Sequence, residues 1–273
     1  MVRKLFKHEL KYYIRSLAPM YIVLAVVALL GRIVFFFEEE STAYEILQGS
    51  SIFMLVVACV AALFLCELFC LVRFYKNLFS GEGYLTMTLP ATPTQHLLTK
   101  LLGAVIANLA TLVAVILAVC LFTVGPWLVE ICKAIAFLFK RVLEAEQEPA
   151  KHVMLYLAEY GVVLLAALFT SLLIYYACIC VGQLAKKNRI IAAIGTYFGL
   201  YVITQIAGTV LIAVASVTDI MEKFGNWLSN LEDAQFYAWT HGFLWIAIGC
   251  ILLVGAGFFL ISKLIISRKL NLE

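Results

Sequence analysis

The sequence predicts an all-α integral membrane protein with six transmembrane helices, an N-terminal interfacial helix and both termini in the cytoplasm. The first observation is composition: 64% of the 273 residues are hydrophobic and 14% are charged, a balance outside the range of soluble globular domains. The second is that the apolar residues come in blocks of about twenty or more, long enough to cross the roughly 30 Å hydrocarbon layer as helices. These blocks lack the strict alternation of a membrane-spanning strand.

Six apolar blocks make up the predicted transmembrane domain, residues 17–262. They lie at Leu17–Phe37, Ser51–Val72, Leu97–Gly125, Val153–Val181, Ile190–Val217 and Trp239–Ser262. The connecting segment 126–152 is amphipathic and contains Glu130, Lys133 and Lys140, each of which would cost about 2.5–3.5 kcal/mol near the bilayer centre. We therefore predict an interfacial helix in this segment rather than a seventh span.

The placement of lysine and arginine predicts the orientation of the chain. Most of the 20 such residues lie in the terminal segments and in alternate loops: Arg3, Lys4, Lys7, Lys11, Arg15, Arg73, Lys76, Lys100, Lys186, Lys187, Arg189, Lys263, Arg268 and Lys269. The opposite loops carry the other basic residues and most of the acidic ones. By the positive-inside rule, residues 1–16 and the tail 263–273 are cytoplasmic, and segments 126–152 and 218–238 are external.

Residues 1–16, MVRKLFKHELKYYIRS, have the pattern of an amphipathic helix. Arg3, Lys7, Lys11 and Arg15 recur at every fourth position, so a helix would place them in one basic stripe opposite an apolar face. Such a helix lies in the membrane interface, where the stripe attracts anionic lipid. The simpler interpretation is an ordinary positively charged flank of the first span.

A polar stretch, RFYKNLFSGEGYLTMTLPATPTQHLLTK (Arg73–Lys100), separates the second and third apolar blocks. Thr92-Pro93-Thr94-Gln95 has the form of a capping box with proline at the first helical position, which predicts a helix that begins at Pro93. Gly81 and Gly83 are expected to end the preceding helix. The cytosolic loop 73–96 would then expose apolar and aromatic side chains, as docking surfaces do.

The same stretch resembles the cytosolic segment between spans two and three of ABC-2 type transporter permeases. That family typically has an acidic residue and a glycine, then an apolar stretch, a proline, a Ser or Thr two residues on and a Lys ten residues on. Here these are Glu82, Gly83, Pro90, Thr92 and Lys100. The gap between Gly83 and Pro90 is shorter than in the family, and the usual second acidic residue is missing.

The six-span layout with an N-terminal interfacial helix is also similar to that family. In ABC-2 permeases an external re-entrant helix lies between spans five and six, which corresponds here to 218–238. The apolar residues of that segment are at helical spacing. An ordinary amphipathic external loop is an equally good interpretation.

The resemblance implies a permease subunit of an ATP-driven exporter in a bacterial plasma membrane. It would pair with a second permease copy or a homologous permease, and with a separate ABC ATP-binding subunit. ATP and Mg would bind to that subunit, because this chain has no G-x-x-x-x-G-K-[ST] phosphate-binding loop. The chain itself is therefore expected to be no enzyme and to bind no cofactor. The residues that the resemblance places in ATPase coupling are Arg73, Lys76, Glu82, Gly83, Tyr84 and Leu85.

Polar residues within the spans are the remaining site candidates. Glu67 is a functional candidate because intramembrane acids are costly, although a structural contact, for instance with Arg73, is the alternative. We interpret Asn108, Thr204 and Gln205 as hydrogen-bonding residues between helices rather than substrate ligands. The four histidines are scattered without metal-ligand spacing, and the eight cysteines fit apolar packing positions. A net charge of +3 does not indicate a nucleic-acid partner.

Two other classes of function compete with transport. A non-transporting membrane scaffold or sensor would use the cytosolic loop to dock a signalling partner. A membrane enzyme is the third class, but the sequence contains no HExxH, no GxSxG and no close pair of intramembrane carboxylates. The few charges within the spans favour a hydrophobic or amphipathic substrate for the transporter.

Overall fold

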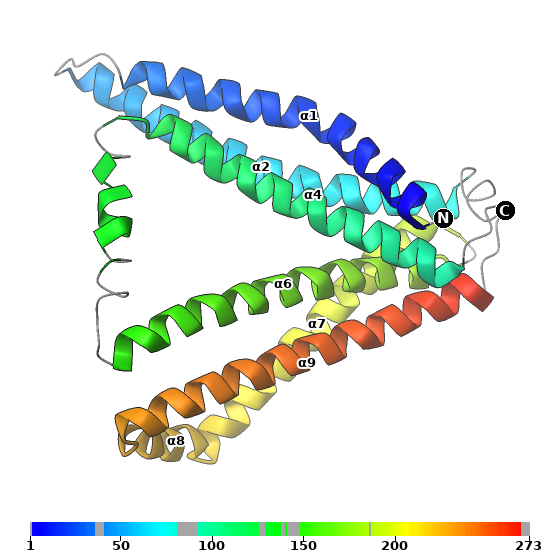
Figure 1. Cartoon of the computed structure of the whole chain (residues 1–273). Helices are drawn as coiled ribbons and strands as arrows, with labels where there is room; N and C mark the ends of the chain where they lie inside the picture. Colours follow the sequence, from blue (N-terminus) through cyan, green and yellow to red (C-terminus); the bar gives the residue numbers. More distant parts are fainter. Residues whose placement is uncertain are drawn as a thin grey trace. The chain divides into compact units, whose positions relative to one another are not determined.

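The computed structural model describes residues 2–35, 41–80, 92–125, 129–130, 132–137, 140, 148–185 and 187–268. In this part of the chain the regular elements are all helical, and no strand occurs. The helices are α1 (Val2–Val34), α2 (Thr42–Phe79), α4 (Pro93–Phe122), α6 (Glu148–Gly182), α7 (Arg189–Val217), α8 (Ile220–Ser229) and α9 (Asp233–Arg268) (Figure 1). The expected all-α class is therefore confirmed.

Every helix except α8 is long and apolar enough to cross a membrane, which makes six candidate spans. This agrees with the number of apolar blocks in the sequence. α1 has 33 residues and α2 has 38, or about 50 Å and 57 Å of helix at 1.5 Å per residue, against roughly 30 Å of hydrocarbon. Both helices are therefore longer than a membrane crossing needs. The predicted interfacial segment 1–16 is helical and continues into the first span as a single helix.

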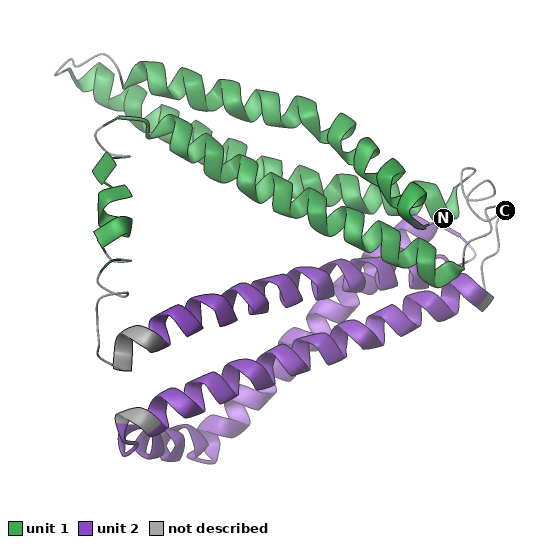
Figure 2. Ribbon diagram, viewed as in Figure 1, with its two compact units in different colours: residues 1–144, 272 green, residues 145–271, 273 purple. Residues whose placement is uncertain are grey.

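The helices form two compact units, residues 1–144 and 145–271 (Figure 2). In the first unit, α1, α2 and α4 all pack against one another. One part of this packing is an apolar cluster of Leu24, Ala28, Leu55, Ala62, Ala118 and Phe122. At one end of the unit, the Tyr44 hydroxyl donates to the Val34 carbonyl at 2.7 Å, which joins the end of α1 to the start of α2.

In the second unit, α6 packs against both α7 and α9. α6 and α7 come very close where a Cβ added to Gly182 would lie 2.5 Å from the backbone nitrogen of Ala193. α6 and α9 are joined in mid-helix by the Thr170 hydroxyl, which donates to the Ile251 carbonyl at 3.1 Å. Glycine at 182 is thus required by the close approach of two backbones.

Two residues with a left-handed backbone conformation lie at helix starts in the second unit. Asn188 (φ 53°) precedes α7 and Asp219 (φ 51°) precedes α8. Asn and Asp adopt this conformation more readily than other side chains that carry a Cβ, because their short polar groups hydrogen-bond locally. Both positions therefore suit sharp changes of chain direction.

The segment 218–238 contains α8 and the start of α9, so the expected helical spacing does form a helix. Its Trp227 ring packs edge-on against Trp239, with centroids 5.2 Å apart, and Phe224 packs against Phe243 at 6.0 Å. α8 is therefore anchored to α9 by aromatic contacts. In the other predicted external segment, 126–152, residues 129–130, 132–137 and 140 are helical and 148–152 belong to α6; the rest of that segment lies outside the described residues.

Candidate functional site

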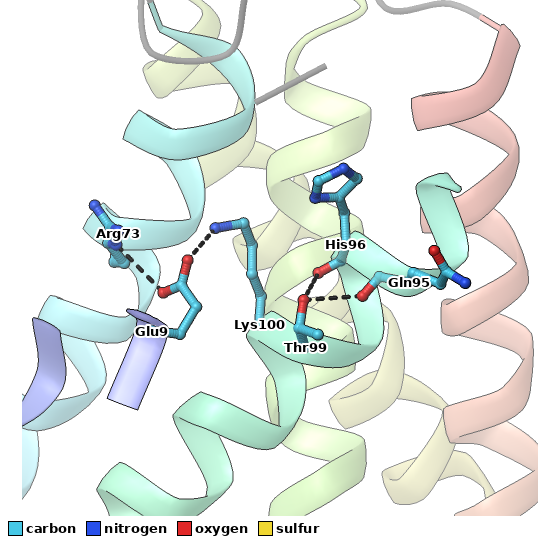
Figure 3. Close-up of polar contacts among 6 residues, drawn as sticks. All are labelled: Glu9, Arg73, Gln95, His96, Thr99 and Lys100. Carbon is cyan, nitrogen blue, oxygen red and sulfur yellow. Dashed lines mark hydrogen bonds and ion pairs between the residues drawn. The ribbon is translucent and has the colours of Figure 1, made fainter. Parts of the chain in front are cut away.

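The strongest polar site of the first unit is a group of three charged side chains from three helices (Figure 3). Glu9 of α1 lies between Arg73 of α2 and Lys100 of α4. Lys100 Nζ donates to Glu9 Oε1 at 2.9 Å, and Arg73 Nε donates to Glu9 Oε2 at 3.3 Å. Tyr12, on the next turn of α1, has its ring 3.8 Å from the Arg73 guanidinium carbon. We call these four residues the Glu9 cluster.

The Glu9 cluster is buried rather than spread over the surface. The Lys100 side chain is only 2% exposed and that of Glu9 7%. Removing a charge from water is costly, and it is tolerated only where good geometry and opposite charge offset the loss of hydration. Each carboxylate oxygen of Glu9 has its own cationic donor, which is the geometry that makes such burial possible. The cluster therefore ties α1 to both α2 and α4.

The start of α4 is built as the sequence predicted. The Gln95 amide donates to Thr92 Oγ1 at 3.3 Å, and the Thr92 amide donates to Gln95 Oε1 at 3.1 Å. Pro93 follows as the first helical residue. This confirms the capping box and the expected first residue of the helix. α2 ends at Phe79, shortly before the glycines expected to end it, which lie outside the described residues.

His96 lies one turn before Lys100, as Figure 3 shows. It is 1% exposed, and neither ring nitrogen has a hydrogen-bond partner in the described part of the chain. Its carbonyl, with that of Gln95, accepts from the Thr99 hydroxyl at 3.0 and 2.9 Å. A buried imidazole without a partner is costly, so His96 marks an unusual polar position close to the loop.

The predicted coupling residues divide into two groups. Arg73 belongs to the Glu9 cluster, and Lys76, one turn later on α2, is exposed. The others, Glu82, Gly83, Tyr84 and Leu85, lie outside the described residues. Thus the structure describes the two helices that flank the loop but not the loop itself.

The predicted basic stripe is on the surface of α1. Arg3, Lys7, Lys11 and Arg15 are all exposed, whereas Tyr13 and Leu17 of the same helix are 3% and 1% exposed. The helix therefore has the two distinct faces that its spacing indicated. Glu9 is turned inward from the stripe and neutralises cations from other helices.

The intramembrane polar candidates occupy different environments. Asn108 Nδ2 donates to its own helix at Ala104 O, 3.1 Å away, and approaches Cys70 Sγ of α2 at 3.9 Å. This contact between helices agrees with our interpretation of Asn108. Thr204 and Gln205 are exposed on α7, where the Thr204 hydroxyl donates to the Tyr201 carbonyl of the same helix.

Glu67 is half-buried on α2, and its Oε2 atom has no hydrogen-bond partner in the described part of the chain. Arg73, which was one expected partner, forms an ion pair with Glu9. A second polar contact between helices joins the Tyr21 and Thr111 hydroxyls at 2.8 Å. Sequence reasoning did not single out this pair.

Glu9 is the central residue that sequence reasoning missed. The available signal was that it is the only acidic residue before Glu38, in a segment rich in lysine and arginine. Lys100 was noted only as one of the cytoplasmic basic residues and as part of the family pattern. No group of three or more His, Cys, Asp or Glu residues in the described ranges is placed to hold a metal ion.

No protein-family model, curated protein or solved structure matches this chain. Its function must therefore be argued from its own residues and their geometry.

Proposed function

We propose that this chain is the permease subunit of an ATP-driven ABC-2 type transporter, coupled to a separate ATPase through the loop between α2 and α4. The observation that carries the proposal is the Glu9 cluster. Its ion pairs join the N-terminal helix to the two helices that flank residues 81–91. A loop that transmits force needs a rigid base, and this cluster supplies one.

In the proposed mechanism, the Glu9 cluster makes the joined helix ends move together when a force acts on the loop. Arg73 on α2 and Lys100 on α4 each lie within two helical turns of the loop. A force on the loop therefore reaches both residues. Both side chains bind the same carboxylate, so α1 moves with them. The capping box at Thr92 keeps the first turn of α4 helical up to the loop. The three helix ends therefore move together rather than fraying separately.

Transport follows from the difference between two states of the ATPase. ATP and Mg bind to the partner subunit, and the loop must contact its two states with different free energies, because otherwise no coupling exists. The permease pairs with a second copy or a related permease, and the path between them opens outward. The apolar character of the spans favours a hydrophobic or amphipathic cargo.

The first experiment identifies the partner. The tagged chain is purified from its native bacterial membranes in a mild detergent, and stoichiometric partners are identified by mass spectrometry. We expect a P-loop ATPase in stoichiometric amount. Recovery of a kinase or another regulator in its place would support the scaffold or sensor function and reject the transporter.

The second experiment tests the loop in the purified complex. Glu82→Gln removes the acidic residue of the family pattern and should lower substrate-linked ATP hydrolysis about tenfold, as expected for loss of one coupling contact of about 1–2 kcal/mol. Glu45→Gln changes an exposed acidic residue in the first turn of α2 and serves as the control. Membrane insertion should be normal in both variants. Unchanged coupled hydrolysis in Glu82→Gln would reject the loop assignment.

A further inference from the structure

A second polar cluster joins α6 to α9 in the second unit, near the first residues of both helices. His152, Tyr156 and Glu159 lie on α6, and Tyr237, His241 and Trp245 lie on α9. Residues three or four positions apart share one face of a helix, so each helix contributes one polar and aromatic face. We call these six residues the α6–α9 cluster. It is separate from the Glu9 cluster and has no part in the proposed coupling to an ATPase.

A continuous chain of hydrogen bonds runs through the α6–α9 cluster. His241 Nδ1 lies 2.7 Å from Glu159 Oε2, and His241 Nε2 lies 2.9 Å from His152 Nδ1. Trp245 Nε1 donates to the other carboxylate oxygen of Glu159 at 3.1 Å. The side chains of His241 and Glu159 are only 17% and 10% exposed. The central imidazole is thus held between a carboxylate and a second imidazole.

These distances limit how many protons the hydrogen-bonded side chains of Glu159, His241 and His152 can carry. An ionised carboxylate only accepts hydrogen bonds, so His241 Nδ1 carries a proton that it donates to Glu159. While His241 is neutral, its Nε2 can only accept, so the contact with His152 needs a proton on His152 Nδ1. One added proton makes His241 an imidazolium that donates to both neighbours. A second added proton would place two N–H groups against each other at 2.9 Å, so this contact must break.

The surrounding rings suit a single positive charge. Tyr156 stacks on His241 with centroids 4.3 Å apart, and Tyr237 stacks on His152 at 4.2 Å. The faces of aromatic rings attract cations. The Tyr156 hydroxyl is buried and has no hydrogen-bond partner in the described part of the chain. No hydrogen bond of this hydroxyl there opposes the stacking of the Tyr156 ring on His241.

Other titratable residues near this end of the unit come from α6, α9 and the α8 region. α6 carries Glu148, Lys151 and Tyr160, α9 begins with Asp233, and α8 and its flanks carry Asp219, Glu222, Lys223 and Glu232. Tyr160 and the residues of the α8 region are exposed. The second half of α7, residues 206–217, has no titratable side chain. Glu159, which is buried, is the carboxylate that contacts His241.

We propose that Glu159, His241 and His152 form a proton-binding site that holds the first turns of α6 and α9 together while it carries at most one added proton, and separates them when both imidazoles are charged. In the orientation that the lysine and arginine distribution predicts, this end of the unit faces the external side. The site would then respond to the pH outside the cell.

The test measures backbone hydrogen exchange of the full chain in lipid nanodiscs at pH about 7.5 and about 5, on either side of the usual range for histidine. The labelling time at each pH is adjusted for the dependence of the intrinsic amide exchange rate on pH. In the wild-type chain, we expect protection of peptides from 152–160 and 235–245 to fall by about tenfold or more in acid, because the first turns open.

Two variants separate proton binding from mere packing. In His152→Gln the amide can either donate to or accept from His241, so the two rings can no longer repel, and the acid response should be lost. Glu159→Gln keeps an acceptor for His241 but loses the negative charge beside it, so protection should be normal at pH about 7.5 and should fall further at pH about 5 than in the wild type. His8→Gln, which removes an exposed histidine of α1, is the control and should respond as the wild type does.

Either of two results would overturn the proposal. One is full protection of the wild-type chain at pH about 5, which would mean that the cluster tolerates acid. The other is an equal acid response in His152→Gln and the wild type, which would place the responsive group elsewhere. Neither result bears on the ATPase partner, which is tested by copurification.

Discussion

Lys100 and Glu9 are 91 positions apart in the chain, yet the Lys100 ammonium donates to the Glu9 carboxylate at 2.9 Å in a buried site. This single contact brings the N-terminal segment against the start of α4. Arg73 binds the other carboxylate oxygen from α2. The cytosolic ends that our orientation assigns to three helices are therefore connected through one acidic side chain.

Replacement of Glu9 by Gln should destabilise the first unit. The change withdraws the negative charge from two cations, one of them almost fully buried, and should lower the free energy of unfolding by about 3 kcal/mol. The measurement is unfolding in mixed micelles by SDS titration. Glu45→Gln, in an exposed position, should cost less than about 1 kcal/mol. Equal effects of the two substitutions would show that Glu9 has no special structural role.

Replacement of Gly182 by Ala should disrupt the contact between α6 and α7. The new Cβ would lie 2.5 Å from the Ala193 nitrogen and 2.6 Å from its Cα, and backbone atoms cannot move aside as a flexible side chain can. Overpacking of this kind costs about 1–3 kcal/mol. The same SDS titration measures the loss.

Gly161 provides the matched control for Gly182, because it lies on the same helix and a Cβ there meets nothing within 4 Å. Gly161→Ala should leave stability unchanged or raise it by up to about 1 kcal/mol, since alanine favours the helix. If Gly182→Ala were as harmless as Gly161→Ala, the close approach of α6 and α7 would be wrong.

The hydroxyls of Tyr21 and Thr111 should be energetically coupled. The Thr111 hydroxyl also hydrogen-bonds the Ala107 carbonyl at 2.9 Å, which leaves its lone pairs to accept from Tyr21. Contacts of this kind between membrane helices are worth about 0.6 kcal/mol on average. A double-mutant cycle of Tyr21→Phe and Thr111→Val measures the coupling.

The control for this cycle pairs Tyr21→Phe with Thr204→Val. The Thr204 hydroxyl donates to the Tyr201 carbonyl of its own helix and lies in the other unit, so its coupling energy to Tyr21 should be zero within error. A coupling of zero for the Thr111 pair as well would contradict the hydrogen bond between α1 and α4.

Replacement of Thr92 by Ala should loosen the start of α4. The variant loses the oxygen that accepts from the Gln95 amide, a change that costs about 1 kcal/mol in helix caps. Hydrogen exchange of the peptide that begins at Pro93 should become about fivefold faster. Thr92→Ser keeps the accepting oxygen and should exchange as the wild type does; fast exchange in Thr92→Ser would mean that the threonine methyl, not the cap, matters.

Much of the fold could be predicted because it depends on properties that are local in the chain. The apolar blocks and the capping box at Thr92 each lie within a few residues or within one helix. The two faces of α1 follow from its four-residue spacing in the same way. Cytoplasmic or external location remains a prediction from charge, and so do the roles of Glu82 and its neighbours.

The polar sites could not be predicted in the same way, because their members are far apart in the sequence. Glu9 was not singled out, and Arg73 was named as a possible partner of Glu67. His152 and His241 read as scattered histidines, although the two rings are hydrogen-bonded across 89 positions. Nothing in the spacing of such residues shows which faces of which helices will meet.

The sequence by itself determined that this chain has six helices suited to a membrane, that one of them begins at Pro93, and which residues of α1 face outward. These follow from hydrophobicity, from the 3.6-residue period and from local hydrogen bonding. The tertiary structure alone decided that Glu9 binds Arg73 and Lys100, and that Glu159 and two histidines form one chain of hydrogen bonds. Such pairings depend on how helices pack, and in an apolar surrounding each buried charge must find its partner on another helix.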